Sequence, residues 1–447
     1  MENVFFVGIN GIGMSGLAKI MKELNYNVAG SDPNSSYTTE NMRKQGIKIY
    51  SEHKSENIKD MDTLIVSTAI GKENPEYKKA MEEGIKVLKR GELLAELLNK
   101  KVGLAVAGTH GKTTTSSMLA TVLLDKDPTV VVGGIVPEIG SNARFGKGEY
   151  FVAEADESDN SFLYMKPKYS VVTNIEADHL EKHGSLENIK KSFDKFITQT
   201  EVEAIVCEDN ENVCNVIAGK SNVVKYSQKN KNSDIFADNV RIENGKTYYD
   251  VYIKGEYVGE FILSIPGNHN VYNSLPVIYL AKKIGVKIED IKDRIESFRG
   301  AKRRYDILFD NGNIKVIDDY AHHPTEIEAT LQGAKSIENR NIAVIFQPHR
   351  YSRVKFLLDE FENTFSNADE LILLPIYSAG EKDEFGVSIE DLQNKINHKN
   401  SRIIKDKDEL ERELLNRSNR HVYMFMGAGN ISAIAHEFAD KLEKKGK

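Results

Sequence analysis

The chain has 447 residues, of which 40% are hydrophobic and 28% are charged, and its formal net charge is -7. At roughly 150 residues per domain, this length predicts about three domains, each large enough to bury a core. The acidic balance argues against broad binding of nucleic acid or anionic membranes, because both need clustered positive charge. We see no secretion signal or apolar run of membrane-spanning length, and two cysteines are too few for a disulfide framework. We therefore expect a cytoplasmic protein that acts on small molecules and leave its oligomeric state open.

The first chemical signal is a glycine-rich loop, GINGIGMSG at residues 8–16, directly after an apolar run at residues 4–7. Its Gly11-x-Gly13-x-x-Gly16 spacing is that of a dinucleotide-binding loop. Asp32 stands about sixteen residues beyond, near the place of the carboxylate that binds a ribose. By itself, this pattern predicts an NAD-dependent oxidoreductase.

Along the chain, short apolar runs alternate with helix-like segments, a pattern typical of parallel α/β domains. We expect strands in three blocks: NVFFVG, NYNVAGSD, DTLIVSTAI and GIKVLK; VGLAVAG, PTVVVGG, EYFVAEAD, YSVVTNI and EAIVC; and NIKVIDDY, NIAVIFQ, DELILLPIY and HVYMFMGAG. Between residues 236 and 265 the strands alternate around Asn244-Gly245 and Lys254-Gly255, which predicts a small antiparallel flap with tight hairpin turns.

A second glycine loop carries the strongest signal. An apolar strand runs into GTHGKTT, and a helix of small residues follows. Glycines let several backbone N–H groups face one anion, the helix N-terminus adds its positive dipole end, and a lysine spreads charge over the phosphates. We expect this loop to bind ATP through Gly108, Thr109, His110, Gly111, Lys112, Thr113 and Thr114.

Acidic side chains and an imidazole follow the next two predicted strands. Glu154 ends one strand, and His179 follows another. Other acidic residues stand nearby in sequence: Asp156, Glu157, Asp159, Glu176 and Asp178. The carboxyl ends of parallel strands meet at one edge of a sheet, where α/β proteins bind ligands. The pattern therefore predicts a magnesium site beside the phosphate loop.

Six motifs in series resemble the Mur ligase family: AGTHGKTTT, AEADESD, TNIEADH, PGNHNVYNSLPV, DDYAHHPTE and FQPHRYSR. The last two favour the members that add L-alanine to UDP-N-acetylmuramate. The resemblance implies a Rossmann-like UDP-sugar domain at 1–98, a central P-loop ATPase-type domain with the flap at 99–299, and a Rossmann-like amino-acid domain at 300–447. It also implies ATP-driven formation of an acyl phosphate from the lactyl carboxylate, which the amine of L-alanine then attacks to release phosphate.

The same resemblance implies roles for individual residues. Lys112, Glu154 and His179 would be catalytic. Thr113 or Thr114 would hold one of two magnesium ions, and Glu154 and His179 the other. The rest of the ATP site would be His269, Asn273, Arg303 and Asp319. The UDP-sugar would meet Gly11, Gly13, Asp32, Ser67, Asn142 and Ser158, and free L-alanine would meet His322, Arg350 and Arg353.

Some residues are assigned no chemistry. We expect His323 to be structural or to cap the helix that starts near Pro324, and His183 and His349 to be structural. Asn10 and Ile12 stand where the family usually has smaller residues, and Asn tolerates a positive φ better than most residues do.

Two further alternatives compete with this interpretation. A recycling ligase that attaches a whole tripeptide to the same sugar nucleotide shares nearly every motif. An ATP-dependent switch or binding protein would also use the phosphate loop.

Overall fold

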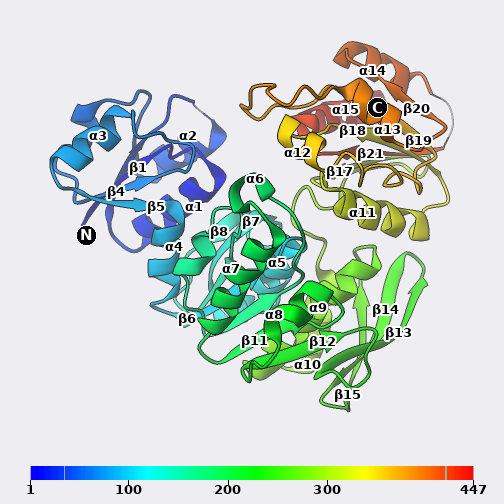
Figure 1. Ribbon diagram of the computed structural model, residues 1–447, viewed down its shortest axis with the longest axis horizontal. Helices are drawn as coiled ribbons and strands as arrows, with labels where there is room; N and C mark the ends of the chain where they lie inside the picture. The colour runs from blue at the N-terminus through cyan, green and yellow to red at the C-terminus, as the bar shows by residue number, and fades with distance from the viewer. Residues whose placement is uncertain (1, 35, 418–419, 446–447) are drawn as a thin grey trace. The chain divides into compact units, whose positions relative to one another are not determined.

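The computed structural model describes residues 2–34, 36–417 and 420–445. Its strands form three sheets, and helices alternate with the strands along the chain, which confirms the predicted α/β class with three sheet-bearing domains (Figure 1). The chain packs as two compact units: residues 1–236, 252–256 and 273–291 form the first, and residues 237–251, 257–272 and 292–447 form the second. None of the helices in the described residues has the length and apolar character needed to cross a membrane.

The first sheet has the strand order β3-β2-β1-β4-β5, with all neighbours parallel. Its strands are β1 (Asn3–Val7), β2 (Asn27–Ser31), β3 (Lys48–Tyr50), β4 (Thr63–Val66) and β5 (Lys86–Lys89). Its helices are α1 (Ile12–Glu23), α2 (Tyr37–Lys44), η1 (Ser55–Ile58), α3 (Pro75–Glu82) and α4 (Arg90–Leu98). Buried side chains of α1, α2 and α4 join one core cluster and those of η1 and α3 another. Both faces of the sheet are therefore covered, as a Rossmann-like domain requires.

The second sheet has ten strands in the order β15-β14-β13-β12-β11-β10-β6-β9-β7-β8. They are β6 (Val102–Ala107), β7 (Thr129–Val136), β8 (Ser141–Arg144), β9 (Tyr150–Glu154), β10 (Tyr169–Val172), β11 (Glu203–Cys207), β12 (Val223–Ser227), β13 (Ile235–Glu243), β14 (Lys246–Ile253) and β15 (Glu256–Leu263). The accompanying helices are α5 (Lys112–Val122), η2 (Leu124–Lys126), η3 (Ser161–Tyr164), α6 (Leu180–His183), α7 (Leu186–Thr198), α8 (Glu211–Ile217), α9 (Asn268–Lys283) and α10 (Ile288–Ser297).

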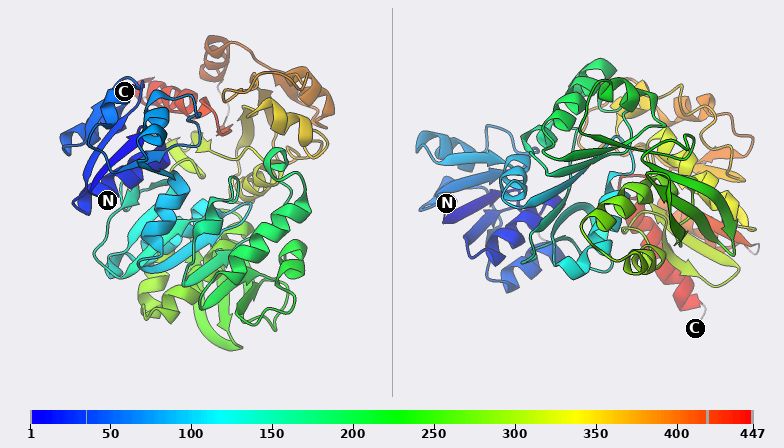
Figure 2. Two further views of the ribbon diagram at one scale, coloured as in Figure 1. Left: turned by 60° about the vertical axis from the view of Figure 1, so that its left-hand side comes forward. Right: turned by 90° about the horizontal axis from the view of Figure 1, so that it is seen from below.

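Strands β13–β15 are the predicted flap and form one end of the second sheet (Figure 2). Asn244, Gly245, Lys254 and Gly255 all have positive φ, so both tight turns lie where the sequence placed them. The strand β6 lies in the middle of the parallel part, between β10 and β9. The loops after these three strands therefore open at the same edge of the sheet.

The third sheet has the order β16-β17-β21-β18-β19-β20, and only the edge pair β16–β17 is antiparallel. Its strands are β16 (Asp306–Asp310), β17 (Ile314–Asp319), β18 (Asn341–Phe346), β19 (Glu370–Leu373), β20 (Ser401–Ile403) and β21 (His421–Met426). Helices α11 (Pro324–Ile337), α12 (Tyr351–Phe356) and α13 (Ile389–Lys395) cover one face, and α14 (Lys407–Leu415) and α15 (Ile431–Lys445) cover the other. This is the second Rossmann-like sheet of the prediction.

Candidate active site

The N-terminal glycine loop joins β1 to α1 and is held by the end of β2. Gly8 has a φ of 79° and donates its N–H to the carbonyl of Ser31. The Asp32 carboxylate accepts the backbone N–H of Asn10 at 3.0 Å. Ser67 follows β4 and lies beside Gly8, where an added Cβ would be 3.3 Å from the Cβ of Ser67. The positive φ of the loop is thus at Gly8, and Asp32 and Ser67 flank it.

Two segments from outside the first sheet reach the start of α1. Asn142, on β8, donates its side-chain amide to the carbonyl of Ile12 at 3.2 Å. The Arg90 guanidinium, at the start of α4, lies over Gly13, whose added Cβ would meet Arg90 Cδ at 2.9 Å. The side chain of Ile12 is exposed. The sequence predicted Asn142 here but missed Arg90, because a lone arginine before a helix carries no distinctive pattern.

The second glycine loop joins β6 to α5 and is braced by the segment after β10. Gly108 and Gly111 have φ values of 139° and 81°. Asn174 accepts the backbone N–H groups of both Thr109 and His110, through its carbonyl at 3.1 Å and its side chain at 2.8 Å. The loop is therefore fixed in shape, with the N-terminus of α5 as its far end.

The Lys112 ammonium donates to three acceptors of the protein. These are the carbonyl oxygens of Gly108 at 2.6 Å and Thr109 at 3.0 Å, and the Glu157 carboxylate at 2.9 Å. Burial by itself disfavours the charged amine, but the carboxylates of Glu157, Glu154 and Asp156 keep the pKa of Lys112 above its usual range. Lys112 is therefore charged within the loop that the sequence assigned to phosphate.

Glu154 and Thr113 face each other across the loop. One Glu154 carboxylate oxygen accepts both the Thr113 hydroxyl and the backbone N–H of Gly133, each at 2.8 Å. Thr114 is buried within α5. Of the two threonines that the sequence left open as metal ligands, Thr113 is the one beside Glu154.

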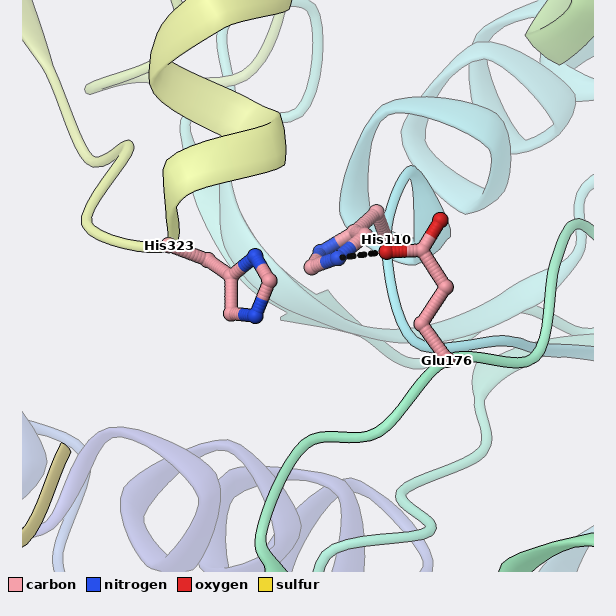
Figure 3. A group of neighbouring side chains, drawn as sticks. All are labelled: His110, Glu176 and His323. Atoms are coloured by element: carbon pink, nitrogen blue, oxygen red, sulfur yellow. Dashed lines mark hydrogen bonds and ion pairs between the residues drawn. The ribbon is translucent and has the colours of Figure 1, made fainter. Parts of the chain in front are cut away.

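The segment after β10 carries Glu176, Asp178 and His179, and its Glu176 contacts the phosphate loop. His110 Nε2 lies 3.2 Å from the Glu176 carboxylate (Figure 3). The backbone N–H of Glu176 in turn donates to the Thr109 hydroxyl. His179 has a φ of 53° and lies 3.5 Å from the Asp178 carboxylate, just before α6. The sequence missed the bond between His110 and Glu176, because it joins residues far apart in the chain.

Two remaining predictions of the first unit concern Ser158, on the loop after β9, and His183, at the end of α6. The backbone N–H of Ser158 bonds the Asp156 carboxylate at 2.9 Å, within the loop that also carries Glu157. His183 is buried and bonded to the carbonyl of Glu157, the structural role expected of it.

The two residues assigned to the adenine lie one turn apart on α9. Asn273 is buried against the phosphate loop, since a Cβ on Gly111 would be 2.5 Å from its side-chain oxygen. Burial and the nearby charge of Arg304 lower the pKa of His269 to about 4. His269 is therefore neutral at physiological pH.

In the second unit, Asp319 is the last residue of β17, and the carbonyl of Arg303, which precedes β16, accepts the N–H of Tyr320, the residue after Asp319, at 2.7 Å. Arg303 has a φ of 63° and donates to the carbonyl of Gly427 at 2.8 Å, with its guanidinium 4.8 Å from the Tyr320 ring centre. Asp319 is buried and accepts the backbone N–H groups of Tyr305 and Ala321. Burial raises the pKa of Asp319 to about 6.

The residues assigned to the amino acid gather around His349. The His349 ring lies 5.9 Å from that of His322 and stacks on Tyr377 at 5.7 Å. Its Nδ1 lies 3.3 Å from a guanidinium nitrogen of Arg353. Burial and the adjacent arginine charges lower the pKa of His349 to about 4, so it is a neutral acceptor. The sequence treated His349 as structural, yet it lies inside the cluster.

Two neighbours of this cluster complete the description. Arg350 has a φ of 69°, and its buried Nε makes no hydrogen bond within the described residues. His323 accepts the N–H of Thr325 and caps α11, so of the two roles that the sequence left open it has the capping one.

Comparison with known proteins matches three family models along the chain. The model "Mur ligase family, catalytic domain" matches residues 3–102, "Mur ligase middle domain" matches residues 106–281, and "Mur ligase, glutamate ligase domain" matches residues 303–429. These ranges follow the order of the three predicted domains.

Individual relatives cover nearly the whole chain. A UDP-N-acetylmuramate–L-alanine ligase from Fusobacterium nucleatum is 56% identical, over 99% of this chain and 97% of the relative. A solved UDP-N-acetylmuramate–alanine ligase from Thermotoga maritima is 33% identical, with a TM-score of 0.84 and 99% of each chain covered. A murein peptide ligase from Psychrobacter arcticus shares the fold, with a TM-score of 0.71, 22% identity and 99% of each chain covered.

Proposed function

Because this chain belongs to the Mur ligase family, we propose that it joins L-alanine to the lactyl carboxylate of UDP-N-acetylmuramate, with conversion of ATP to ADP and phosphate. The observation that carries this assignment is the braced phosphate loop, with a half-buried charged lysine and a facing Thr113–Glu154 pair, in the same compact unit as the sugar-type glycine loop. The similarity to L-alanine ligases over nearly the whole chain supports the choice of amino acid.

The first half of the reaction is phosphoryl transfer to a carboxylate. The lactyl carboxylate attacks the γ-phosphate of ATP, and the bond from that phosphate to ADP breaks to leave an acyl phosphate. The protein takes little covalent part in this step. Catalysis therefore depends mainly on positioning and on charge neutralisation by Lys112 and the N–H groups at the start of α5. His110 and Asn174 keep the loop in shape for this step.

Magnesium fits the residues beside the loop. The Thr113 hydroxyl and the Glu154 carboxylate, 2.8 Å apart, are oxygen donors of the kind this ion prefers. We propose that they hold one ion and that Glu154 and His179 hold a second. Bound magnesium would neutralise the charge of the transferring phosphate.

The remaining substrate contacts follow the same proposal. The diphosphate and the uridine of the UDP-sugar lie at the N-terminal glycine loop. Their contacts there are Gly11, Gly13, Asp32, Ser67, Arg90, Asn142 and Ser158. His269, Asn273, Arg303 and Asp319 serve the nucleotide. Arg350, Arg353 and His322 take free L-alanine, since a guanidinium can bond both oxygens of a carboxylate.

We place the enzyme in the cytoplasm. Both cysteines, Cys207 and Cys214, are free thiols, which suits a reducing compartment. ATP, the co-substrate of the proposed reaction, is available there.

Turnover with different amines tests the function. ADP formation is followed with UDP-N-acetylmuramate and, separately, L-alanine, L-serine, glycine or an L-Ala-γ-D-Glu-containing peptide. We expect L-alanine to be preferred. Turnover with the peptide alone would identify the recycling ligase, nucleotide turnover indifferent to sugar and amine would identify a switch, and saturable binding of NAD but not of the UDP-sugar would identify an oxidoreductase.

Replacing the loop lysine tests the site. We expect Lys112→Ala to lower kcat by roughly a thousandfold or more, because it removes the main positive charge from the phosphates. Binding of UDP-N-acetylmuramate, measured by calorimetry, should persist. Loss of sugar binding together with turnover would show that the two sites are not separate.

A further inference from the structure

Two neighbouring carboxylates on one loop face two different cations. The loop at residues 155–160 leaves β9 and turns towards η3. Asp156 lies 3.7 Å from an Arg90 guanidinium nitrogen, and Glu157 lies 2.9 Å from the Lys112 ammonium. Arg90 lies over the sugar-type glycine loop, and Lys112 belongs to the phosphate loop. One short loop therefore contacts a cation from each of the two proposed substrate sites.

All the hydrogen-bond donors of the Lys112 ammonium are already used within the protein. An ammonium has three N–H donors, and the carbonyls of Gly108 and Thr109 and the Glu157 carboxylate accept them all. Glu157 is 4% exposed, and its second oxygen is buried and makes no hydrogen bond within the described residues. Lys112 must therefore release at least one of these contacts before it can bind a phosphate, and the Glu157 carboxylate would itself repel that phosphate.

The Arg90 end is joined to the same loop by close packing. An added Cβ on Gly91 would lie 2.3 Å from Ser161 Cβ, so the start of α4 packs directly on the start of η3. The loop also contacts α6, because the carbonyl of Glu157 bonds His183 Nε2 at 3.0 Å as well as the backbone N–H of Asn160. A change in the position of Arg90 is therefore transmitted to the loop through packed atoms.

We propose that Glu157 is a positioning residue that holds Lys112 away from the nucleotide until the UDP-sugar is bound, and that the Asp156–Arg90 pair links this release to the sugar site. The sugar diphosphate competes with Asp156 for Arg90, the loop shifts, and Lys112 exchanges Glu157 for the phosphates of ATP. This inference rests on the roles proposed above for Lys112 and the glycine loop. By linkage, ATP and the UDP-sugar each strengthen the binding of the other.

Glu157→Gln tests the hold on Lys112. The variant keeps the shape of the side chain and removes its charge. We expect the KM for ATP to fall about tenfold, and ADP formation without UDP-N-acetylmuramate to rise about tenfold relative to the full reaction, because a charge-assisted bond no longer opposes nucleotide binding.

The matched control is Glu203→Gln. Glu203 pairs with Lys283 at 2.7 Å in the same compact unit, away from both loops. Both kinetic values should stay at the wild-type level in this variant. If Glu157→Gln instead raises the KM for ATP, or leaves uncoupled ADP formation unchanged, Glu157 supports the loop only and the proposal is overturned.

Asp156→Asn tests the link and does not depend on the folding of the first variant. In the wild type, saturating UDP-N-acetylmuramate should lower the Kd of a non-hydrolysable ATP analogue about tenfold. In Asp156→Asn that reduction should largely disappear, and an undiminished reduction would contradict the link. Failure of the wild type to turn over ATP with sugar and L-alanine would overturn the proposed function itself, so the two failures are distinguishable.

Discussion

At the scale of single residues, Arg350 stands out because its buried Nε has no hydrogen-bond partner within the described part of the chain. A buried donor without a partner costs about 1–3 kcal/mol. Its neighbour His349 is neutral, and that ring already lies against Arg353. A carboxylate bound here would satisfy Arg350, which is the physical reason to place the substrate amino acid beside it.

Arg350→Lys tests that placement. Lysine keeps the charge but loses the planar fork, so we expect the KM for L-alanine to rise roughly ten- to a hundredfold. The KM for ATP should change by less than about twofold, because the arginine would not touch the nucleotide. Arg402→Lys, which alters an ion pair with Glu370 in the same sheet, is the control and should leave both values unchanged. Equal increases for both substrates would argue against an amino-acid pocket at Arg350.

Asp319 gives a prediction about pH. Burial raises its pKa from 3.8 to about 6. Between these values the folded protein holds a proton that the unfolded chain has released, so this residue favours folding most below pH 3.8 and loses that effect as the pH rises through about 6. Asp319→Asn stays uncharged. The difference in the free energy of unfolding, variant minus wild type, should therefore rise by up to about 3 kcal/mol from about pH 4 to about pH 7. Urea unfolding at each pH measures it.

Asp310 supplies a control with the opposite sign. Although burial opposes the effect, hydrogen bonds from Arg340 and Gly312 lower the pKa of Asp310 to about 2. Its carboxylate therefore stabilises the fold above the ordinary value of 3.8 and loses that contribution as the pH falls. Asp310→Asn should be destabilised near neutral pH and approach wild type in acid. The same trend in both variants would contradict the assignment of Asp319.

At the scale of elements, the phosphate loop shows how two segments define one structure. The turn needs glycine twice, since Gly108 and Gly111 both have positive φ. It also needs the segment after β10, because Asn174 accepts two of its N–H groups. The sequence predicted the loop from its own residues, whereas the bracing segment was recognised only as a source of acidic side chains and of the metal-ligand candidate His179.

Gly108→Ala tests the fit of this loop. Its Cβ would lie 2.0 Å from the Thr173 hydroxyl and 3.1 Å from the backbone nitrogen of Asn174, so the loop must move. We expect kcat to fall by about a hundredfold or more, because catalysis depends on loop position. Gly219→Ala is the control: Gly219 also has a positive φ but nothing within 4 Å of an added Cβ. It should cost about 1–2 kcal/mol of stability and leave kcat unchanged. Equal activity in the two variants would contradict the argument.

At the scale of the whole molecule, the proposed reaction uses residues from both compact units. The phosphate and sugar loops belong to the first, and Arg303, His322 and Arg350 belong to the second. All the substrates meet in one reaction, so we expect groups of both units to contact them during turnover, with closure of the domains around them. We expect the radius of gyration, measured by small-angle scattering, to fall when an ATP analogue and UDP-N-acetylmuramate are added together. An unchanged radius in the liganded protein would argue against closure.

Much of the fold could be read from the sequence because short apolar runs that alternate with helix-like segments are typical of parallel α/β domains. The strands missed were β3, β8, β12, β16 and β20, of which β3 and β20 have three residues each. Most of these lie at sheet edges, where one side has no partner and a continuous apolar run is not required. The flap was predicted with both turns, since Asn-Gly and Lys-Gly pairs set the backbone locally.

Residues that are neighbours in the chain set the two glycine loops, the hairpin turns and the His323 cap, and these features could be predicted. Which distant side chains meet is set by the tertiary structure. It placed Arg90 on Gly13, Glu157 on Lys112, Thr113 rather than Thr114 on Glu154, and His349 among the arginines. The physical reason is that backbone geometry is set by local φ, ψ and hydrogen bonding, whereas a pairing of charges across a sheet edge depends on strand order, which no local pattern encodes.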